Sequence, residues 1–288
     1  MLSLRDLLEA YCANNLNLRP SSEKQLCYSV SSLCRWLDCE PRIDDLSAQQ
    51  ICGWLKSRPP KVTARRDRGN ILCLLRYAHA EGLLDSVPRV PRITLDRKAP
   101  QAWSVGDLEK LLAAAGNMPG MMRDLPLSKA WWWQSQILYQ YETGLRATSA
   151  LSTRSCDVWL DRRCALVRSD FDKTHADRVV RLSESLCDLL RRGAIGSRDL
   201  VWLWPWTKRK LWLDWSELLR SAGLPTGRQS GFHRLRRTHA TMAVLSAGWE
   251  RAQLSLGHSS VAMTKRYVDP TMLAAATPRI ELPEPRIA

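Results

Sequence analysis

Paired cysteines are missing from this 288-residue sequence. Its nine cysteines stand singly, their number is odd, no C-x-x-C pair occurs, and none lies beyond Cys187. This pattern argues against a zinc site and against a disulfide framework, both of which need cysteines at close or matched spacings. We therefore expect reduced, mostly buried thiols and predict neither a metal ion nor another cofactor.

Long apolar runs are also missing. No stretch of 18 or more apolar residues occurs, which argues against a membrane-spanning helix. Acidic residues come early in the first nine residues, and no apolar segment with a small-residue cleavage site follows, which argues against a secretory signal. From these absences we expect a cytoplasmic protein without a membrane partner.

Negative charge is scarce relative to positive charge. The formal net charge is +14, of which residues 1–100 contribute +5 and the remainder +9. The length allows two domains, each with its own core. Because both parts are basic, a polyanion that contacts both would explain the excess, and DNA is the best candidate. A basic surface without a partner is the alternative.

Phenylalanine is nearly absent, with two residues against thirteen tryptophans. A cluster spans Trp202 to Trp206, and Trp212 and Trp215 follow it. These indoles could stack on bases, but the interpretation that we favour is core packing in which tryptophan supplies the volume.

The first 95 residues carry the pattern of four short amphipathic helices, which predicts a small helical bundle. The helices are expected over about 4–11, 22–37, 47–58 and 62–80, with Pro59 and Pro60 ending the third. Cations gather at the start of the fourth helix, and either a phosphate-contacting face or a solvated helix face would explain them; these residues are Lys61, Arg65, Arg66 and Arg68. Prolines and charges predict a linker over 96–101.

A second domain is expected over 102–288. Ser104 is a good N-cap for its first helix, and an apolar helix follows over 131–141. Three strands are predicted over 156–160, 164–168 and 179–182, forming an antiparallel meander, and Ser183 caps the next helix. Helices are expected from 205 to 276, and an extended tail follows. The predicted class is therefore mainly α (α+β), with a small three-stranded sheet in the second domain.

The last third of the chain holds a spaced set of cationic and imidazole side chains that ends at a tyrosine. Gly231-Phe-His-Arg-Leu-Arg-Arg-Thr-His239 is followed by Leu256-Gly-His-Ser-Ser260 and Thr264-Lys-Arg-Tyr267, and upstream lie Thr143-Gly-Leu-Arg146 and Lys173. Cleaving a phosphodiester without a metal requires cationic donors, a covalent nucleophile and an acid for the leaving oxygen. The set supplies a candidate for each requirement.

In order and spacing, this set resembles the catalytic domain of the tyrosine recombinases, the phage-integrase family of site-specific DNA recombinases. The resemblance covers most of 102–276 and, more weakly, the amino-terminal bundle, which would be the core-binding domain. It implies site-specific cleavage and rejoining of DNA through a 3′-phosphotyrosyl intermediate, without metal or ATP. The six residues that it marks as catalytic are Arg146, Lys173, His233, Arg236, His258 and Tyr267, the last as nucleophile.

The resemblance also assigns a role to each residue. Arg146 and Arg236 would grip the scissile phosphate, for which a guanidinium is suited because it stays charged and binds two oxygens. Lys173 would protonate the leaving 5′ oxygen, His233 would accept or position the tyrosyl proton, and His258 would bind a non-bridging oxygen. We assign His79, His175 and His239 to structure or surface.

Two positions depart from the family pattern. Ser149 stands where an acidic residue is often found, and Arg234 stands where aspartate is often found. Neither is one of the six chemical groups, but both could alter the support of the site and lower the rate.

The resemblance further implies double-stranded recombination sites as partners and a homotetramer on two such sites. The segment after Tyr267 would be exchanged between protomers. A type IB-like topoisomerase and a catalytically silent DNA-binding integrase homologue are the alternatives.

Overall fold

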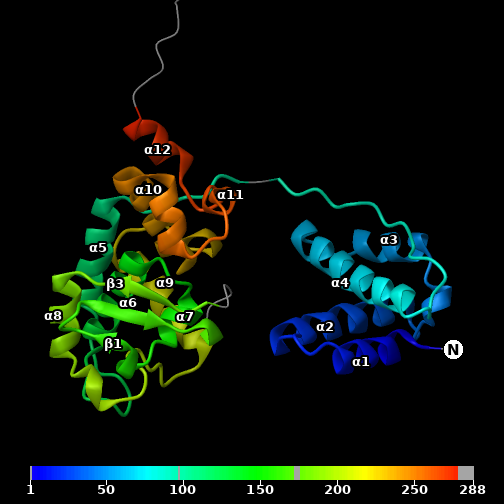
Figure 1. Ribbon diagram of the computed structural model, residues 1–288, viewed down its shortest axis with the longest axis horizontal. Helices are drawn as coiled ribbons and strands as arrows, with labels where there is room; N and C mark the ends of the chain where they lie inside the picture. The colour runs from blue at the N-terminus through cyan, green and yellow to red at the C-terminus, as the bar shows by residue number, and fades with distance from the viewer. Residues whose placement is uncertain (1, 97, 172–175, 278–288) are drawn as a thin grey trace, which may run out of the picture. The chain divides into compact units, whose positions relative to one another are not determined.

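The computed structural model describes residues 2–96, 98–171 and 176–277, and the chain divides into two compact units, Met1–Arg97 and Lys98–Ala288 (Figure 1). The division lies within the segment 96–101 that the sequence analysis expected to be the linker. Lys173 and His175 lie outside the described residues. Among the described residues, none of the helices combines the length and the apolar content needed to cross a bilayer.

The first unit is a helical bundle. Its helices are α1 (Leu4–Asn14), α2 (Pro20–Leu37), α3 (Ala48–Lys56) and α4 (Lys61–Ala80). Ser3 and Ser47 form capping boxes at the starts of α1 and α3, and Pro20 occupies the first turn of α2. The leucines and isoleucines of the predicted helical stripes form one buried cluster between the four helices. The four predicted helices are therefore confirmed.

Two of the four cations near the start of α4 form hydrogen bonds within the bundle. Arg68 donates from Nε to the carbonyl of Pro91 and from Nη2 to that of Val90, both at 2.6 Å. Arg66 donates to the buried carboxylate of Asp67. Lys61 and Arg65 are exposed on the surface of α4.

The second unit is a helical domain around a small sheet. Its helices up to the sheet are α5 (Val105–Gly116), α6 (Lys129–Thr143) and α7 (Ala147–Leu151), and those after the sheet are α8 (Glu184–Arg192), α9 (Lys208–Ser221), α10 (His233–Leu256), α11 (Val261–Thr264) and α12 (Pro270–Ala276). Ser104 and Ser183 cap α5 and α8, as predicted.

The sheet is an antiparallel meander in the order β1-β2-β3, which confirms the predicted fold class. Its strands are β1 (Val158–Trp159), β2 (Cys164–Val167) and β3 (Arg178–Arg181). The prediction for the first strand was too long, because residues Ser155–Asp157 form a turn of 3-10 helix. That turn places the buried carboxylate of Asp157 against Arg168, which donates to it twice at 2.7 Å.

Tryptophans fill the core of this unit. Trp132, Trp133, Trp202 and Trp215 are at most 1% exposed. The rings of Trp132, Trp133 and Trp215 pack in a group with Trp204 and Phe232, and the ring of Trp202 packs against Tyr139. This confirms core packing for Trp202 and Trp215, whereas Trp212 remains 41% exposed. Large rings from α6, α9 and the start of α10 therefore fix these helices relative to one another.

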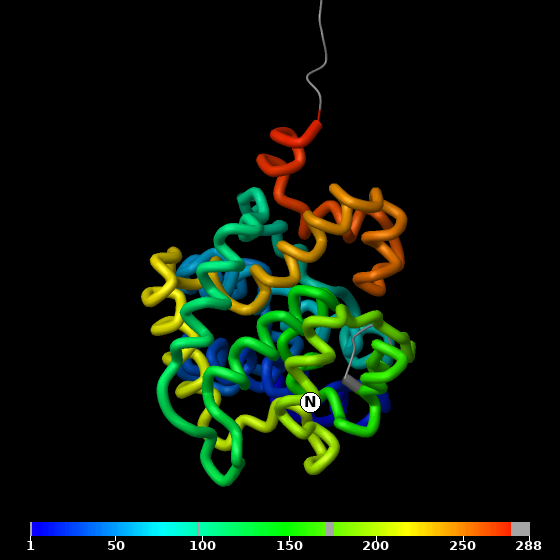
Figure 2. The backbone as a smooth tube through the Cα atoms, turned by 90° about the vertical axis from the view of Figure 1, so that its left-hand side faces the viewer, coloured from blue at the N-terminus to red at the C-terminus, as the bar shows by residue number. Residues whose placement is uncertain are grey.

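The last three helices form one edge of the second unit, as both views show (Figures 1 and 2). Helix α10 is interrupted at Gly248, whose φ of 81° belongs to the left-handed region. A separate apolar cluster joins α10 to the segment after α11 through Ala240, Val244, Leu256 and Val268. Helix α12 has no buried residue, so few apolar contacts hold it.

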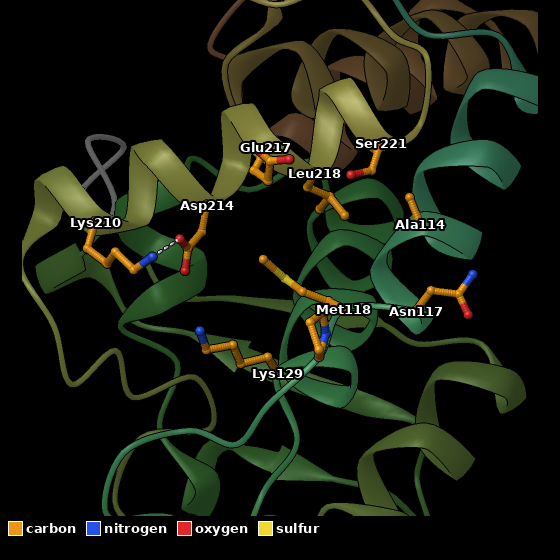
Figure 3. Close-up of a pocket in the computed structure, with 10 residues that line it drawn as sticks. Ala114, Asn117, Met118, Lys129, Lys210, Asp214, Glu217, Leu218 and Ser221 are labelled. Atoms are coloured by element: carbon orange, nitrogen blue, oxygen red, sulfur yellow. Dashed lines mark hydrogen bonds and ion pairs between the residues drawn. The ribbon is translucent and has the colours of Figure 1, made fainter.

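A pocket of about 580 Å³ lies between α5 and α9 (Figure 3). Met118 and Leu218 contribute apolar wall, and Lys210 forms an ion pair with the buried Asp214 at 2.5 Å. Of the six predicted catalytic residues, the five that the structure describes do not line this pocket.

Candidate active site

Gly144 shapes the chain just before the first candidate arginine. It ends α6 in the left-handed conformation, with φ of 62°, and a Cβ there would lie 2.4 Å from Cδ2 of His239. Arg146 follows as the N-cap residue of α7 and is half-buried. From this position the positive charge of Arg146 lowers the pKa of both Arg236 and His233.

Arg236 is fully buried in α10 and binds three groups from other parts of the unit. Nη1 donates to the carbonyl of Gly144, and Nη2 donates to the carbonyl of Leu256 at 3.0 Å and to Nε2 of His258 at 2.8 Å. Its Nε is buried without a hydrogen-bond partner among the described residues. Burial, with the nearby charge of Arg146, lowers the pKa of Arg236 to about 10, so the side chain remains cationic at neutral pH.

His258 is buried, and its hydrogen bonds define its tautomer. A guanidinium can only donate, so Nε2 of His258 accepts from Arg236. Nδ1 therefore carries the proton and donates to Oγ1 of Thr264 at 3.0 Å. Gly257 ends α10 in the left-handed conformation, and the His258 amide donates to the carbonyl of Gln253, which fixes the backbone of this turn.

His233 begins α10 and differs from His258 in being exposed. Partial desolvation of its ring and the positive charges of Arg237, Arg236 and Arg146 lower the pKa of His233 to about 4. The imidazole is therefore neutral at physiological pH and has a lone pair available for a proton.

Tyr267 lies in the turn after α11, where its amide donates to the carbonyl of Thr264. Its ring centroid is 5.1 Å from that of His233 and 4.9 Å from that of His258. The guanidinium carbon of Arg236 lies 5.1 Å from the same ring centroid. The phenol thus lies among two imidazoles and a buried cation, and all of these groups come from one chain.

Five of the six residues predicted from the sequence therefore belong to one cluster: Arg146, His233, Arg236, His258 and Tyr267. The sixth, Lys173, lies outside the described residues. His239 has a structural position, with Nδ1 donating to the carbonyl of Tyr141 and Nε2 lying 3.0 Å from Oγ of Ser255.

Sequence reasoning missed Thr264, the partner of His258. It is fully buried and lies six residues after the histidine, a spacing that predicts no contact unless the intervening turn is known.

Across the described ranges, no three His, Cys, Asp or Glu side chains gather closely enough to hold a metal ion.

A buried arginine, two histidines and a tyrosine thus gather near the carboxyl end of a helical domain that contains a small meander sheet. The sequence model of the phage integrase family matches residues 105–273, and the chain belongs to this family. This confirms the resemblance inferred from the motifs.

The individual proteins compared with this chain match it either over a short segment or at low sequence identity. The putative tyrosine recombinase XerC of Pseudomonas aeruginosa is 33% identical over 66 residues, which cover 23% of this chain and 16% of that protein. Lambda integrase residues 75–356, solved as a dimer bound to a COC′ core site, has a TM-score of 0.72 at 17% identity, covering 92% of this chain and 95% of that one. The XerH recombinase bound to difH has a TM-score of 0.69 at 20% identity, covering 93% and 82%. At these identities the solved structures show a shared fold.

Proposed function

We propose that this protein is a site-specific DNA recombinase that cuts and rejoins strands through a phosphotyrosyl intermediate at Tyr267. The observation that carries the proposal is the position of the Tyr267 ring, about 5 Å from each of His233, His258 and the Arg236 guanidinium. Membership of the phage integrase family supports the same reaction.

The proposed chemistry is a transesterification. The phenolic oxygen of Tyr267 forms a bond to phosphorus while the bond from phosphorus to the 5′ oxygen breaks, leaving a 3′-phosphotyrosyl ester and a 5′ hydroxyl. The phenolic proton passes to the neutral His233, and Lys173 supplies a proton to the leaving oxygen. Attack by a 5′ hydroxyl of a partner strand reverses these steps, so rejoining consumes no ATP.

The cationic groups would stabilise the pentavalent transition state. Arg146 and Arg236 would bind the non-bridging oxygens, and the Nε of Arg236, buried without a hydrogen-bond partner among the described residues, supports this role because a phosphate oxygen could accept from it. For His258 to donate from Nε2 to the phosphate, the imidazole must take up a second proton or change tautomer, because Nδ1 already donates to Thr264.

We also propose that the substrate is double-stranded DNA carrying recombination sites and that two sites are brought together by a homotetramer, with the segment after Tyr267 exchanged between protomers. Solved structures of the fold include a lambda integrase tetramer bound to a Holliday junction. The proposed place of action is the cytoplasm. In the first unit, Lys61, Arg65 and Arg66 are exposed candidates for phosphate contacts, although Arg66 also pairs with Asp67. Arg68 is half-buried and already donates to two backbone carbonyls.

A plasmid carrying two copies of the DNA that flanks the gene tests the proposal. Deletion or inversion between the copies is the expected product with the wild-type protein, and Tyr267→Phe should yield none. Relaxed topoisomers without rearrangement would favour a topoisomerase. Binding without any strand cleavage would favour a silent DNA-binding homologue.

A further inference from the structure

The backbone of Ala102 is hydrogen-bonded on both sides by the segments that carry the candidate catalytic residues. Its N–H donates to Oδ2 of Asp269 at 2.9 Å, and its carbonyl accepts from Nη2 of Arg234 at 2.9 Å and from Nε at 3.3 Å. Asp269 follows Tyr267 by two residues, and Arg234 lies between His233 and Arg236 in sequence. The backbone of this one residue therefore links the segment that contains Tyr267 to the first turn of α10.

Further hydrogen bonds extend this link along one face of α10. Arg234, Thr238 and Thr241 are spaced by four and three residues, which places them on the same face of the helix. Oγ1 of Thr238 accepts from the amide of Trp103 at 2.8 Å, and Oγ1 of Thr241 accepts from the amide of Asp269 at 2.9 Å.

Most of the link is buried, and Arg234 is half-buried. Thr238 and Thr241 are fully buried and Asp269 is 6% exposed. The guanidinium carbon of Arg234 lies 3.5 Å from the ring centroid of Trp103, so the cation is held by the indole face as well as by the carbonyl. Hydrogen bonds to charged groups are stronger than neutral ones, and in a buried position they tolerate little displacement.

Little else fixes the chain after the nucleophile. Val268 is the buried apolar residue beside Tyr267, and α12 has no buried residue of its own. Asp269 also caps α12 by accepting from the amide and the hydroxyl of Thr271 through Oδ1. One carboxylate oxygen of Asp269 therefore accepts from Ala102, and the other caps α12.

We propose that Asp269 is a positioning residue for Tyr267, acting with Arg234 through the backbone of Ala102. The inference rests on the proposed function, because it concerns the reach of the Tyr267 oxygen to a phosphorus atom. A nucleophile displaced by about 1 Å can lose on the order of 10²-fold in rate, so a link that fixes its backbone on both sides matters for cleavage. Arg234, which departs from the family pattern, thereby has a defined partner in this chain.

The test is single-turnover cleavage of a nicked DNA substrate by Asp269→Asn in the full chain. Asparagine keeps the size but has one acceptor oxygen, so it cannot serve both Ala102 and Thr271. We expect the rate constant to fall about 10- to 100-fold with the dissociation constant for DNA unchanged. Arg234→Lys keeps the charge but loses the forked contact, and it should show a smaller loss of the same kind.

A substrate with a 5′-bridging sulfur separates positioning of the nucleophile from protonation of the leaving group. A thiolate leaves without a proton, so the defect of Lys173→Ala should largely disappear on this substrate. The defect of Asp269→Asn should persist, because the phenol must still reach the phosphorus. Rescue of Asp269→Asn by the sulfur would overturn the inference.

Asp214→Asn is the matched control, since Asp214 is a buried aspartate of the same unit that pairs with Lys210 beside the pocket in Figure 3. With cleavage expressed per folded molecule, this control should retain the wild-type rate. The inference is overturned if Asp269→Asn cleaves like the wild type or loses no more than Asp214→Asn. A wild-type protein that forms no covalent adduct overturns the proposed function itself, which distinguishes the two failures.

Discussion

The guanidinium of Arg236 donates to Nε2 of His258 at 2.8 Å, so two groups expected to bind the same phosphate also contact each other. Binding a phosphate through His258 must redirect this contact, because Nε2 cannot accept from Arg236 and donate to an oxygen at once.

Replacing Arg236 by lysine should damage cleavage far more than DNA binding. Lysine keeps the charge, but a single ammonium cannot reproduce the planar donors that contact Gly144, Leu256 and His258. We expect Arg236→Lys to cleave a nicked substrate about 10²- to 10³-fold more slowly, by comparison with the loss of an oxyanion donor. Affinity for the same DNA, measured in parallel at fixed salt, should change little. An unimpaired cleavage rate would remove Arg236 from the mechanism.

The hydroxyl of Thr264 should matter through the orientation of His258. Thr264→Val keeps the shape but removes the hydroxyl that accepts from Nδ1–H of His258 in a buried position. We expect the cleavage rate constant to fall roughly tenfold, which corresponds to about 1.4 kcal/mol and is comparable to a lost hydrogen bond. Thr153→Val is a suitable control, because its buried hydroxyl lies 3.2 Å from that of Tyr139 and has no contact with His258 or Tyr267 among the described hydrogen bonds. Equal losses per folded molecule in both variants would contradict this role.

Gly144 should resist substitution for two separable reasons. Gly144→Ala places a Cβ 2.4 Å from the ring of His239 and forces a left-handed conformation, so we expect a loss of about 1–3 kcal/mol or more in unfolding free energy. Gly223→Ala has a similar φ of +66° with open space around the added carbon, and should therefore show the conformational cost alone. Urea unfolding of both variants measures the difference, and equal losses would mean that the contact with His239 is relieved without cost.

Acid should destabilise the second unit partly through His239. Burial lowers the pKa of His239 to about 4, below the value near 6.5 expected in the unfolded chain. Between these values the unfolded state binds a proton that the folded state does not, so the contribution is present above pH 6.5 and is lost as the pH falls toward 4. In urea unfolding, His239→Gln should show a shallower loss of stability over this interval than the wild type. Parallel curves would contradict the assignment.

The clustering of the candidate catalytic residues that the structure describes could be predicted from the sequence, because each lies in a local motif with its own turn. Gly144 before Arg146 and Gly257 before His258 are glycines in the left-handed conformation, which a sequence can suggest. Most helices were predictable for a similar reason, since apolar periodicity and caps such as Ser47, Ser104 and Ser183 are local signals.

Contacts between distant segments were not predictable. Asp269 before Pro270 has the pattern of a helix cap, and nothing in its neighbourhood indicates the hydrogen bond to Ala102, 167 residues away. The same holds for Thr264 and His258, whose contact depends on the path of a turn. The break at Gly248 was missed because a single glycine is tolerated within many helices.

The most direct test of the account is the site of covalent attachment. A nicked DNA substrate that releases its 5′ fragment traps the intermediate, and mass spectrometry of the digested adduct locates the modified residue. The account predicts a 3′-phosphate linked to Tyr267 in the wild type and no adduct with Tyr267→Phe. An adduct on another residue, or one that survives in Tyr267→Phe, would contradict it.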